Sequence, residues 1–178
     1  MEPSAPNEDL LLQCQRFRVE KARHQTPDGT WHQREVVRHP GSVVIVPMVT
    51  PDSVCLIRNF RVAVADWLVE LPAGTLEPDE PLEETAYREL IEETGFTATT
   101  VRHLHSFYAA PGILDEYMRL FVAEGLTPGA SAREAGELIE NLIVDFDDAL
   151  GMVFDGTIRD AKTIVGLLYW NQLRRQRS

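Results

Sequence analysis

Short apolar runs alternate with polar turn formers along most of the chain. Runs of this length that are rich in β-branched residues predict strands. We expect strands at residues 11–24, 31–38, 42–49, 54–60, 69–73, 101–108, 118–124 and 138–145. The turn sequence Thr26-Pro27-Asp28-Gly29 separates the first two, so these two strands are expected to form a hairpin.

Boundary residues predict three helices among these strands. They are expected at 81–94 between Pro81 and Gly95, from a cap at Asp145 or Asp147 to about Phe154, and from a cap at Asp160 onward. The inward face of the last helix is expected to hold Ile164, Leu167, Leu168 and Asn171. Strands mixed with a few helices predict an α/β or α+β sandwich.

Three glutamates fall together on the predicted helix at 81–94. Glu89, Glu92 and Glu93 lie within an arc of about 100° because positions i, i+3 and i+4 are neighbours on a helix. Three adjacent carboxylates repel one another unless they share a cation, and Mg²⁺ takes oxygen ligands of this kind. Arg88 is four residues before Glu92 and is expected to orient it. A solvated acidic face is the alternative for this run when it is considered alone.

Composition excludes several classes of protein. The formal net charge of the 178 residues is −11, and no basic stripe is present, which argues against a nucleic-acid partner. No segment has the pattern of a signal peptide or a membrane span, so no membrane partner is expected. Cys14 and Cys55 have no metal spacing and are expected to be reduced core thiols. We therefore expect a cytoplasmic protein.

The stretch GTLEPDEPLEETAYRELIEETGF resembles the Nudix box. The fixed places of that motif are held by Gly74, Glu80, Arg88, Glu89, Leu90, Glu92, Glu93, Gly95 and Phe96, without a departure. Nine places over twenty-three residues make the resemblance specific. It implies an α/β/α sandwich with a mixed central sheet, and cleavage of nucleoside diphosphates linked to another moiety with Mg²⁺ or Mn²⁺.

The resemblance also implies roles for the residues of the box. Glu89 and Glu93 would be direct metal ligands, and Glu92 would be a ligand or would hold a metal-bound water. The carbonyl of Ala73 would add a ligand, and Arg88 would orient the glutamates. The expected organisation is a loose segment at 1–9, a β-hairpin subdomain at 10–40 for dimerisation and substrate, and a Nudix domain at 41–178 with its box at 74–96.

Features outside the box are similar to the ADP-ribose and ADP-sugar pyrophosphatase branch of the family. The sequence Glu70-Leu71-Pro72-Ala73-Gly74 looks like the entry to the box in that branch, and Pro111 stands where the branch has a marker proline. The resemblance implies hydrolysis of ADP-ribose to AMP and ribose 5-phosphate by a homodimer. ADP-glucose or another nucleoside-diphosphate sugar is the alternative substrate. A sensor that binds the nucleotide without cleaving it is the alternative function, and a mutated-nucleotide or cap hydrolase is a weaker one.

A general base and several substrate contacts are also implied. The base of this branch can come from an acidic loop, here 131–140, in which Glu137 is favoured and Glu134 is the second candidate. Arg61 would contact a phosphate, and Arg34 and Glu35 in the hairpin would contact the adenine. Glu116 would bind the terminal ribose. Glu70 would support the metal site or pair with an arginine.

Overall fold

A mixed β-sheet forms the centre of the computed structural model, which describes residues 9–132 and 138–176. Its main strands are β4 (Ser42–Thr50), β5 (Ser53–Arg61), β9 (Thr100–Tyr108), β10 (Tyr117–Glu124) and β12 (Ile139–Asp145). Their order is β12-β5-β4-β10-β9; β4 and β10 are parallel and the other neighbours antiparallel. A separate two-stranded pairing joins β8 (Phe96–Thr97) and β11 (Thr127–Pro128). The predicted mixed sheet is confirmed.

The structure has two strands where one was predicted at 69–73. Strand β6 (Asp66–Glu70) pairs with β5, and strand β7 (Ala73–Thr75) pairs with β4. Pro72 has no N–H to donate to a ladder, but its carbonyl accepts a hydrogen bond from Ile45 N at 2.9 Å. The chain therefore changes partner strand here, and Glu70 and Ala73 belong to different ladders.

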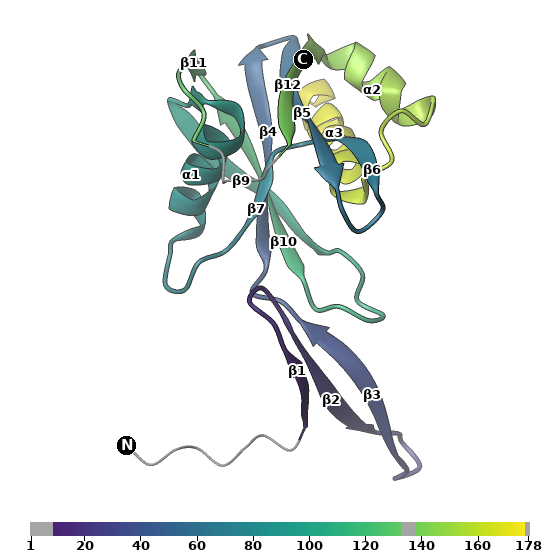
Figure 1. Ribbon diagram of the computed structural model, residues 1–178. Coiled ribbons are helices and arrows are strands. Elements are labelled where there is room, and N and C mark those ends of the chain that lie inside the picture. The colour runs from purple at the N-terminus through teal and green to yellow at the C-terminus, as the bar shows by residue number, and fades with distance from the viewer. Residues whose placement is uncertain (1–8, 133–137, 177–178) are drawn as a thin grey trace.

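Helices cover both faces of the central sheet (Figure 1). Helix α1 (Leu82–Thr94) packs on one face, while α2 (Phe146–Phe154) and α3 (Ala161–Arg175) pack on the other. Alternate residues of β4 serve the two layers: Val43 and Ile45 pack on the α1 side, and Val44 and Val46 pack on the α3 side. All four are fully buried, which stabilises the fold by about 1.5–3 kcal/mol for each side chain. The α/β/α sandwich is confirmed.

Helix α1 has the ends that its sequence predicts. It begins at Leu82, directly after the extended Pro81, and it ends at Gly95. Gly95 has a φ of +77° and donates its N–H to the carbonyl of Ile91 at 2.8 Å. A Cβ at this position would lie 2.8 Å from the carbonyl oxygen of Gly129, so both conformation and space favour glycine.

The two C-terminal helices agree with the prediction in position and differ in detail. Helix α2 follows Asp145, but the side chain of this residue makes no capping hydrogen bond. Asp160 does cap α3, because its carboxylate accepts a hydrogen bond from Thr163 N at 3.0 Å. The predicted inward face of α3 is partly wrong, since Leu168 is 38% exposed. The side chains and the glycine that are buried on α3 are Lys162, Thr163, Gly166, Leu167 and Trp170.

A three-stranded antiparallel sheet projects from the main body as an arm (Figure 1). Its strands are β1 (Leu10–Gln13), β2 (Arg18–Gln25) and β3 (Trp31–Arg38). The single strand predicted at 11–24 is wrong, because the chain reverses where Cys14 N donates to the carbonyl of Phe17 at 2.9 Å. This turn contains neither glycine nor proline, so no local turn signal marks it along the chain. Cys14 is only partly buried, in contrast to Cys55, so just one of the two thiols lies in the core.

The base of the arm is fixed to the loop between β9 and β10. Val37 N donates to the carbonyl of Ile113 at 2.9 Å, and Asp115 N donates to the carbonyl of Val37 at 3.1 Å. The carboxylate of Asp115 also accepts hydrogen bonds from Arg38 Nη1 at 3.1 Å and His39 N at 2.8 Å. These bonds hold the arm beside the segments that line the candidate site.

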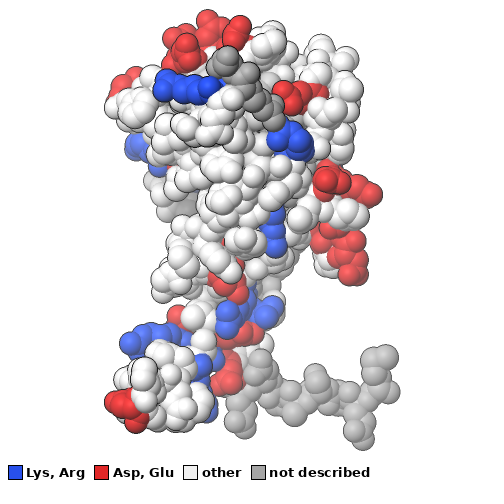
Figure 2. Space-filling view, turned by 180° about the vertical axis from the view of Figure 1, so that it is seen from behind, with Lys and Arg blue, Asp and Glu red and all other residues white. Residues whose placement is uncertain are grey.

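The charges on the back of the molecule form no basic stripe (Figure 2). Acidic side chains gather at the top and along one side of this face, while Lys and Arg are scattered. Within the described residues, no helix is both long and apolar enough to cross a membrane.

Candidate active site

Arg88 is the centre of a charged network on α1. Its Nε and Nη2 donate to the two carboxylate oxygens of Glu80, both at 2.9 Å. Its Nη1 donates to Glu89 Oε1 at 2.8 Å and to Glu92 Oε2 at 2.9 Å. The hydrogen bonds that Arg88 donates to Glu80, followed by the charge of Glu89, raise the pKa of Arg88 well above its usual value. Arg88 therefore holds Glu89 and Glu92, two of the three glutamates expected at the metal site.

Gly74 lies against the carboxylate of Glu89. A Cβ placed on Gly74 would be 1.8 Å from Glu89 Cδ and 1.9 Å from Glu89 Oε1. Gly74 pairs with Val43 across the ladder between β7 and β4, so its backbone cannot move away easily. The absence of a side chain at Gly74 is what allows the glutamate to occupy its present place.

Glu93 is held from the same strand. Ala73 N donates to Glu93 Oε2 at 2.9 Å. Glu89 and Glu93 are 8% and 5% exposed, so these carboxylates are largely withdrawn from water. Burial of a carboxylate is costly without a partner or a metal ion. The oxygen-rich set of Glu89, Glu92, Glu93 and the neighbouring Ala73 backbone therefore has the donor chemistry that Mg²⁺ requires.

These carboxylates do not yet converge on one point. Within the described residues, no group of three acidic, histidine or cysteine side chains is arranged to hold a metal ion. The contacts above give the reason, since Arg88 binds Glu89 and Glu92 while the backbone of Ala73 binds Glu93.

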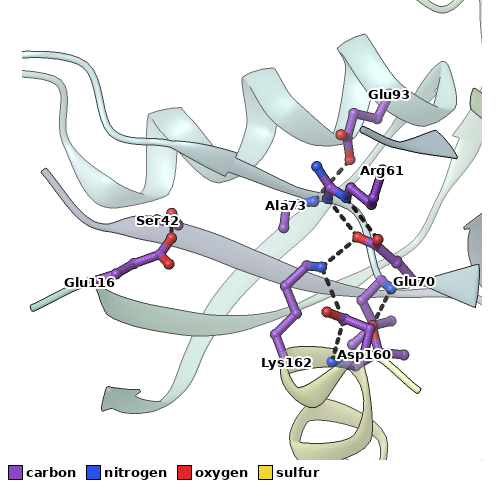
Figure 3. A network of polar contacts seen from close by, with 10 residues as sticks. Ser42, Arg61, Glu70, Ala73, Glu93, Glu116, Asp160 and Lys162 are labelled. Carbon is purple, nitrogen blue, oxygen red and sulfur yellow. Dashed lines mark hydrogen bonds and ion pairs between the residues drawn. The ribbon is translucent and has the colours of Figure 1, made fainter. Parts of the chain in front are cut away.

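A second charged network faces α1 across the site (Figure 3). Glu70 is fully buried, and its two oxygens accept hydrogen bonds from Arg61 Nε at 2.8 Å and Arg61 Nη2 at 2.6 Å. Lys162 Nζ lies 2.5 Å from Glu70 Oε2 and 3.0 Å from Asp160 Oδ2. Burial by itself would raise the pKa of Glu70, but the hydrogen bond from Arg61 and the charge of Lys162 lower it. Of the two predicted readings for Glu70, the structure shows the pairing with an arginine.

Both networks line one open cavity of about 1130 Å³. Arg61, Glu70 and Lys162 lie on one side of it, and the carboxylates of α1 lie on another. The turn between β1 and β2 contributes Gln15 and Arg16, which sequence analysis did not identify. Lys162 was also missed, because no local pattern distinguishes it from a surface lysine near a helix start. Asp160 was identified only as a helix cap.

Glu116 lies at the other end of the cavity. Its Oε1 accepts a hydrogen bond from Ser42 Oγ at 2.5 Å (Figure 3). His39 Nδ1 lies 3.7 Å from the same oxygen. The same Nδ1 accepts a hydrogen bond from Gly41 N at 3.1 Å, so its lone pair is directed at that backbone amide. Ser42 is therefore the group that orients Glu116.

Two of the predicted site residues are not brought to the cavity, and two others cannot be placed against it. Arg34 and Glu35 are exposed on β3, and neither is among the described residues that line the cavity. Arg34 Nη1 donates instead to the carbonyl of the adjacent Gln33 at 2.9 Å. Glu134 and Glu137, the candidates for the general base, lie outside the described residues.

Comparison with known proteins identifies the family of the chain. The sequence model of the NUDIX domain family matches residues 37–165 of the chain. The chain is 37% identical over 147 residues to an ADP-ribose pyrophosphatase of Bacillus subtilis, covering 82% of this chain and 80% of that protein. It is 39% identical over 172 residues to a GDP-mannose pyrophosphatase of Cronobacter sakazakii, covering 85% of this chain and 87% of that protein.

A solved structure shows the same fold. The crystal structure of an ADP compounds hydrolase superposes with a TM-score of 0.84 at 22% identity, covering 100% of this chain and 97% of that one. The family match spans the box, its helix and the strands that hold Arg61, Glu70 and Ala73. The chain therefore belongs to the Nudix family and is a Nudix hydrolase.

Proposed function

We propose that this protein hydrolyses the pyrophosphate of ADP-ribose to AMP and ribose 5-phosphate in a Mg²⁺-dependent reaction. The observation that carries the proposal is the cavity in which the carboxylates of α1 face Arg61 on β5. One wall offers oxygen donors for a metal ion, and the other offers a guanidinium for a phosphate. The names of the relatives, which include an ADP-ribose pyrophosphatase, favour the same class of substrate.

The proposed metal ligands are Glu89, Glu93 and the carbonyl of Ala73, with Glu92 as a ligand or a holder of a metal-bound water. Nudix hydrolases generally use divalent metals such as Mg²⁺, and Mn²⁺ is the alternative here. A bound divalent ion offsets the charge of a pyrophosphate and lowers the pKa of a coordinated water. The chain contributes the position of the carboxylates, which Arg88 and the backbone of Ala73 hold at the cavity wall.

The substrate contacts are proposed from the remaining cavity residues. Arg61 donates to Glu70 through Nε and Nη2, and its side chain is 40% exposed. It is therefore placed to donate to a phosphate oxygen. Glu116 has one oxygen bound by Ser42 and the other available to a hydroxyl of the terminal ribose. Glu70 acts through Arg61 in this proposal.

Glu137 is proposed as the general base, with Glu134 as the alternative. Replacement of each by glutamine separates the two, because only the base should lower kcat strongly and change its pH profile. Equal and mild losses of kcat in both variants would place the base on another segment.

A nucleoside-diphosphate sugar other than ADP-ribose is the second candidate substrate. The similarity to a GDP-mannose pyrophosphatase favours it, and ADP-glucose belongs to the same class. A sensor that binds without cleaving is a third candidate. The three buried or half-buried carboxylates argue against it, because binding alone does not need them.

Product formation from a substrate panel tests the proposal. The panel contains ADP-ribose, ADP-glucose, GDP-mannose, NADH and diadenosine polyphosphates, each with Mg²⁺ and with EDTA. AMP appearing fastest from ADP-ribose, and only with the metal, is the expected result. Fastest cleavage of GDP-mannose would support the second candidate. Tight binding of ADP-ribose without turnover of any compound would support the sensor.

We also propose a homodimer that is joined through the arm. The arm exposes the large apolar side chains Leu10, Leu11, Leu12, Phe17 and Trp31. It also holds Arg34 and Glu35, which lie away from the cavity of their own chain and would reach a substrate only in a partner's cavity. Light scattering after size-exclusion chromatography should give twice the monomer mass of 20.1 kDa. A monomer of full activity would contradict the proposal.

A further inference from the structure

Lys162 lies at a position where both burial and the helix dipole disfavour its positive charge. Its side chain is 8% exposed and lies in the first turn of α3, where the helix dipole disfavours a cation. Burial also disfavours the charged form of a lysine. Two carboxylates offset these costs, since Nζ contacts Glu70 Oε2 at 2.5 Å and Asp160 Oδ2 at 3.0 Å.

A purely structural tie at this point is already supplied by Thr163. Leu71 N donates to Thr163 Oγ1 at 2.8 Å, and Thr163 Oγ1 donates to Asp160 Oδ2 at 2.5 Å. These bonds attach the start of α3 to the junction between β6 and β7 without any contribution from Lys162. The charge of the lysine is therefore not needed for this attachment, which leaves its purpose to be found among the neighbouring charges.

The charges around Glu70 indicate what that purpose is. Asp160 caps α3, and the helix N-terminus offsets its charge with about half a positive charge. Lys162 is then left to balance Glu70, which is fully buried. Because Lys162 balances Glu70, Arg61 keeps its own charge for a ligand in the cavity, even though Nε and Nη2 donate to that carboxylate.

We infer that Lys162 is a positioning residue for the pyrophosphate of the substrate. It shares Glu70 with Arg61, so the guanidinium is held in a fixed plane by Glu70 but is not neutralised by it. The inference rests on the proposed function, because it assumes that Arg61 binds a substrate phosphate. It adds a residue on α3 to a site that the box on α1 and the strand β5 otherwise form.

Without Lys162, Glu70 would have Arg61 as its remaining cation. The ion pair between them would strengthen, and the guanidinium would have to leave an unbalanced buried carboxylate in order to serve a phosphate. Substrate binding should therefore weaken more than the chemical step. Arginine at this position would keep the charge and should restore most of the binding.

Steady-state kinetics with ADP-ribose and Mg²⁺ test the inference on Lys162→Met, Lys162→Arg and the control Arg159→Met. Lys162→Met should raise KM about 10-fold, which corresponds to ~1.4 kcal/mol, with a smaller change in kcat. Lys162→Arg should return KM to within about three-fold of the wild type. Arg159 lies three residues before Lys162 and forms an exposed ion pair with Asp66, so its replacement should leave KM and kcat unchanged.

A double-mutant cycle with Arg61→Met separates positioning from a structural role. If Lys162 acts through Arg61, Lys162→Met should change KM little in the Arg61→Met background. Multiplying losses in the double variant would overturn the inference, as would an unchanged KM in Lys162→Met. If Lys162→Met fails to fold, the KM of Lys162→Arg and of Lys162→Gln in the same cycle decides the question. Wild-type protein that neither cleaves nor binds ADP-ribose would overturn the proposed function together with this inference. Normal wild-type activity, with losses that multiply in the double variant, would overturn the inference alone.

Discussion

Replacement of Gly74 by alanine should separate catalysis from stability. The new Cβ would lie 1.8 Å from Glu89 Cδ, 1.9 Å from Oε1 and 2.1 Å from Oε2. Non-bonded carbon atoms are most stable about 3.5–4.0 Å apart, so the carboxylate must move by roughly 2 Å. The carboxylate is the end of a flexible side chain, so the fold can accommodate the move while the metal ligand is lost.

The expected size of each effect follows from these contacts. A misplacement of about 1 Å can lower a rate about 100-fold, so kcat for ADP-ribose should fall by at least that factor, or ~2.7 kcal/mol. The hydrogen bond from Arg88 Nη1 to Glu89 is 2.8 Å long. Its loss should lower the free energy of unfolding by no more than about 3 kcal/mol. For a domain of this size, that is a fall in Tm of less than about 12 °C.

AMP release at several Mg²⁺ concentrations, together with thermal unfolding, provides the assay. Gly151→Ala is the matched control, since a Cβ at Gly151 in α2 would meet no heavy atom within 4 Å. That variant should keep wild-type kcat and gain a little stability, because alanine is the better helix former. Should Gly74→Ala retain kcat within three-fold and the same Mg²⁺ dependence, the assignment of Glu89 as a metal ligand would be refuted.

Three further predictions concern the metal site, the pH dependence and the packing of α3. Glu93→Gln should abolish most turnover and weaken Mg²⁺ binding in calorimetry, and unchanged activity would remove Glu93 from the metal site. The folded-state pKa of Glu70 is lowered below its usual 4.5, so its stabilising contribution is complete above pH 4.5 and is lost as the pH falls through the lowered value. Urea unfolding of Glu70→Gln should therefore show a stability deficit at pH 7 that shrinks below pH 4.5, and a deficit independent of pH would contradict the pairing with Arg61. Gly166→Ala should lower the free energy of unfolding measured in urea by about 1 kcal/mol, since its Cβ would lie 2.5 Å from Leu71 Cδ1, and a raised free energy would show that the interface adapts.

Local features of the sequence predicted much of the fold. The ends of α1 follow from Pro81 and Gly95, whose backbone preferences act within a few residues. The buried strand β4 follows from an apolar β-branched run, because such a run is stable only when both of its faces are covered. These signals need no knowledge of distant segments.

The pairing of strands could not be predicted in the same way. Strict alternation predicts His103 and His105 on the same face of β9. The structure has a bulge there, since Leu120 pairs with His105 and Phe121 pairs with His103. The two rings consequently contact different layers, His103 against Phe121 and His105 against Tyr169 of α3. An extra residue in one strand is set by the fit of two strands, and neither strand alone encodes it.

The same distinction between local signals and tertiary contacts applies to the candidate site. The sequence by itself determined that Glu89, Glu92 and Glu93 share one side of α1 and that Arg88 lies beside them, because a helix repeats every 3.6 residues. Only the tertiary structure decided that Lys162 and Glu70, which are 92 positions apart, share a hydrogen bond in the opposite wall. The packing of α3 against the junction of β6 and β7 brings them together, and burial then makes each charge depend on the other.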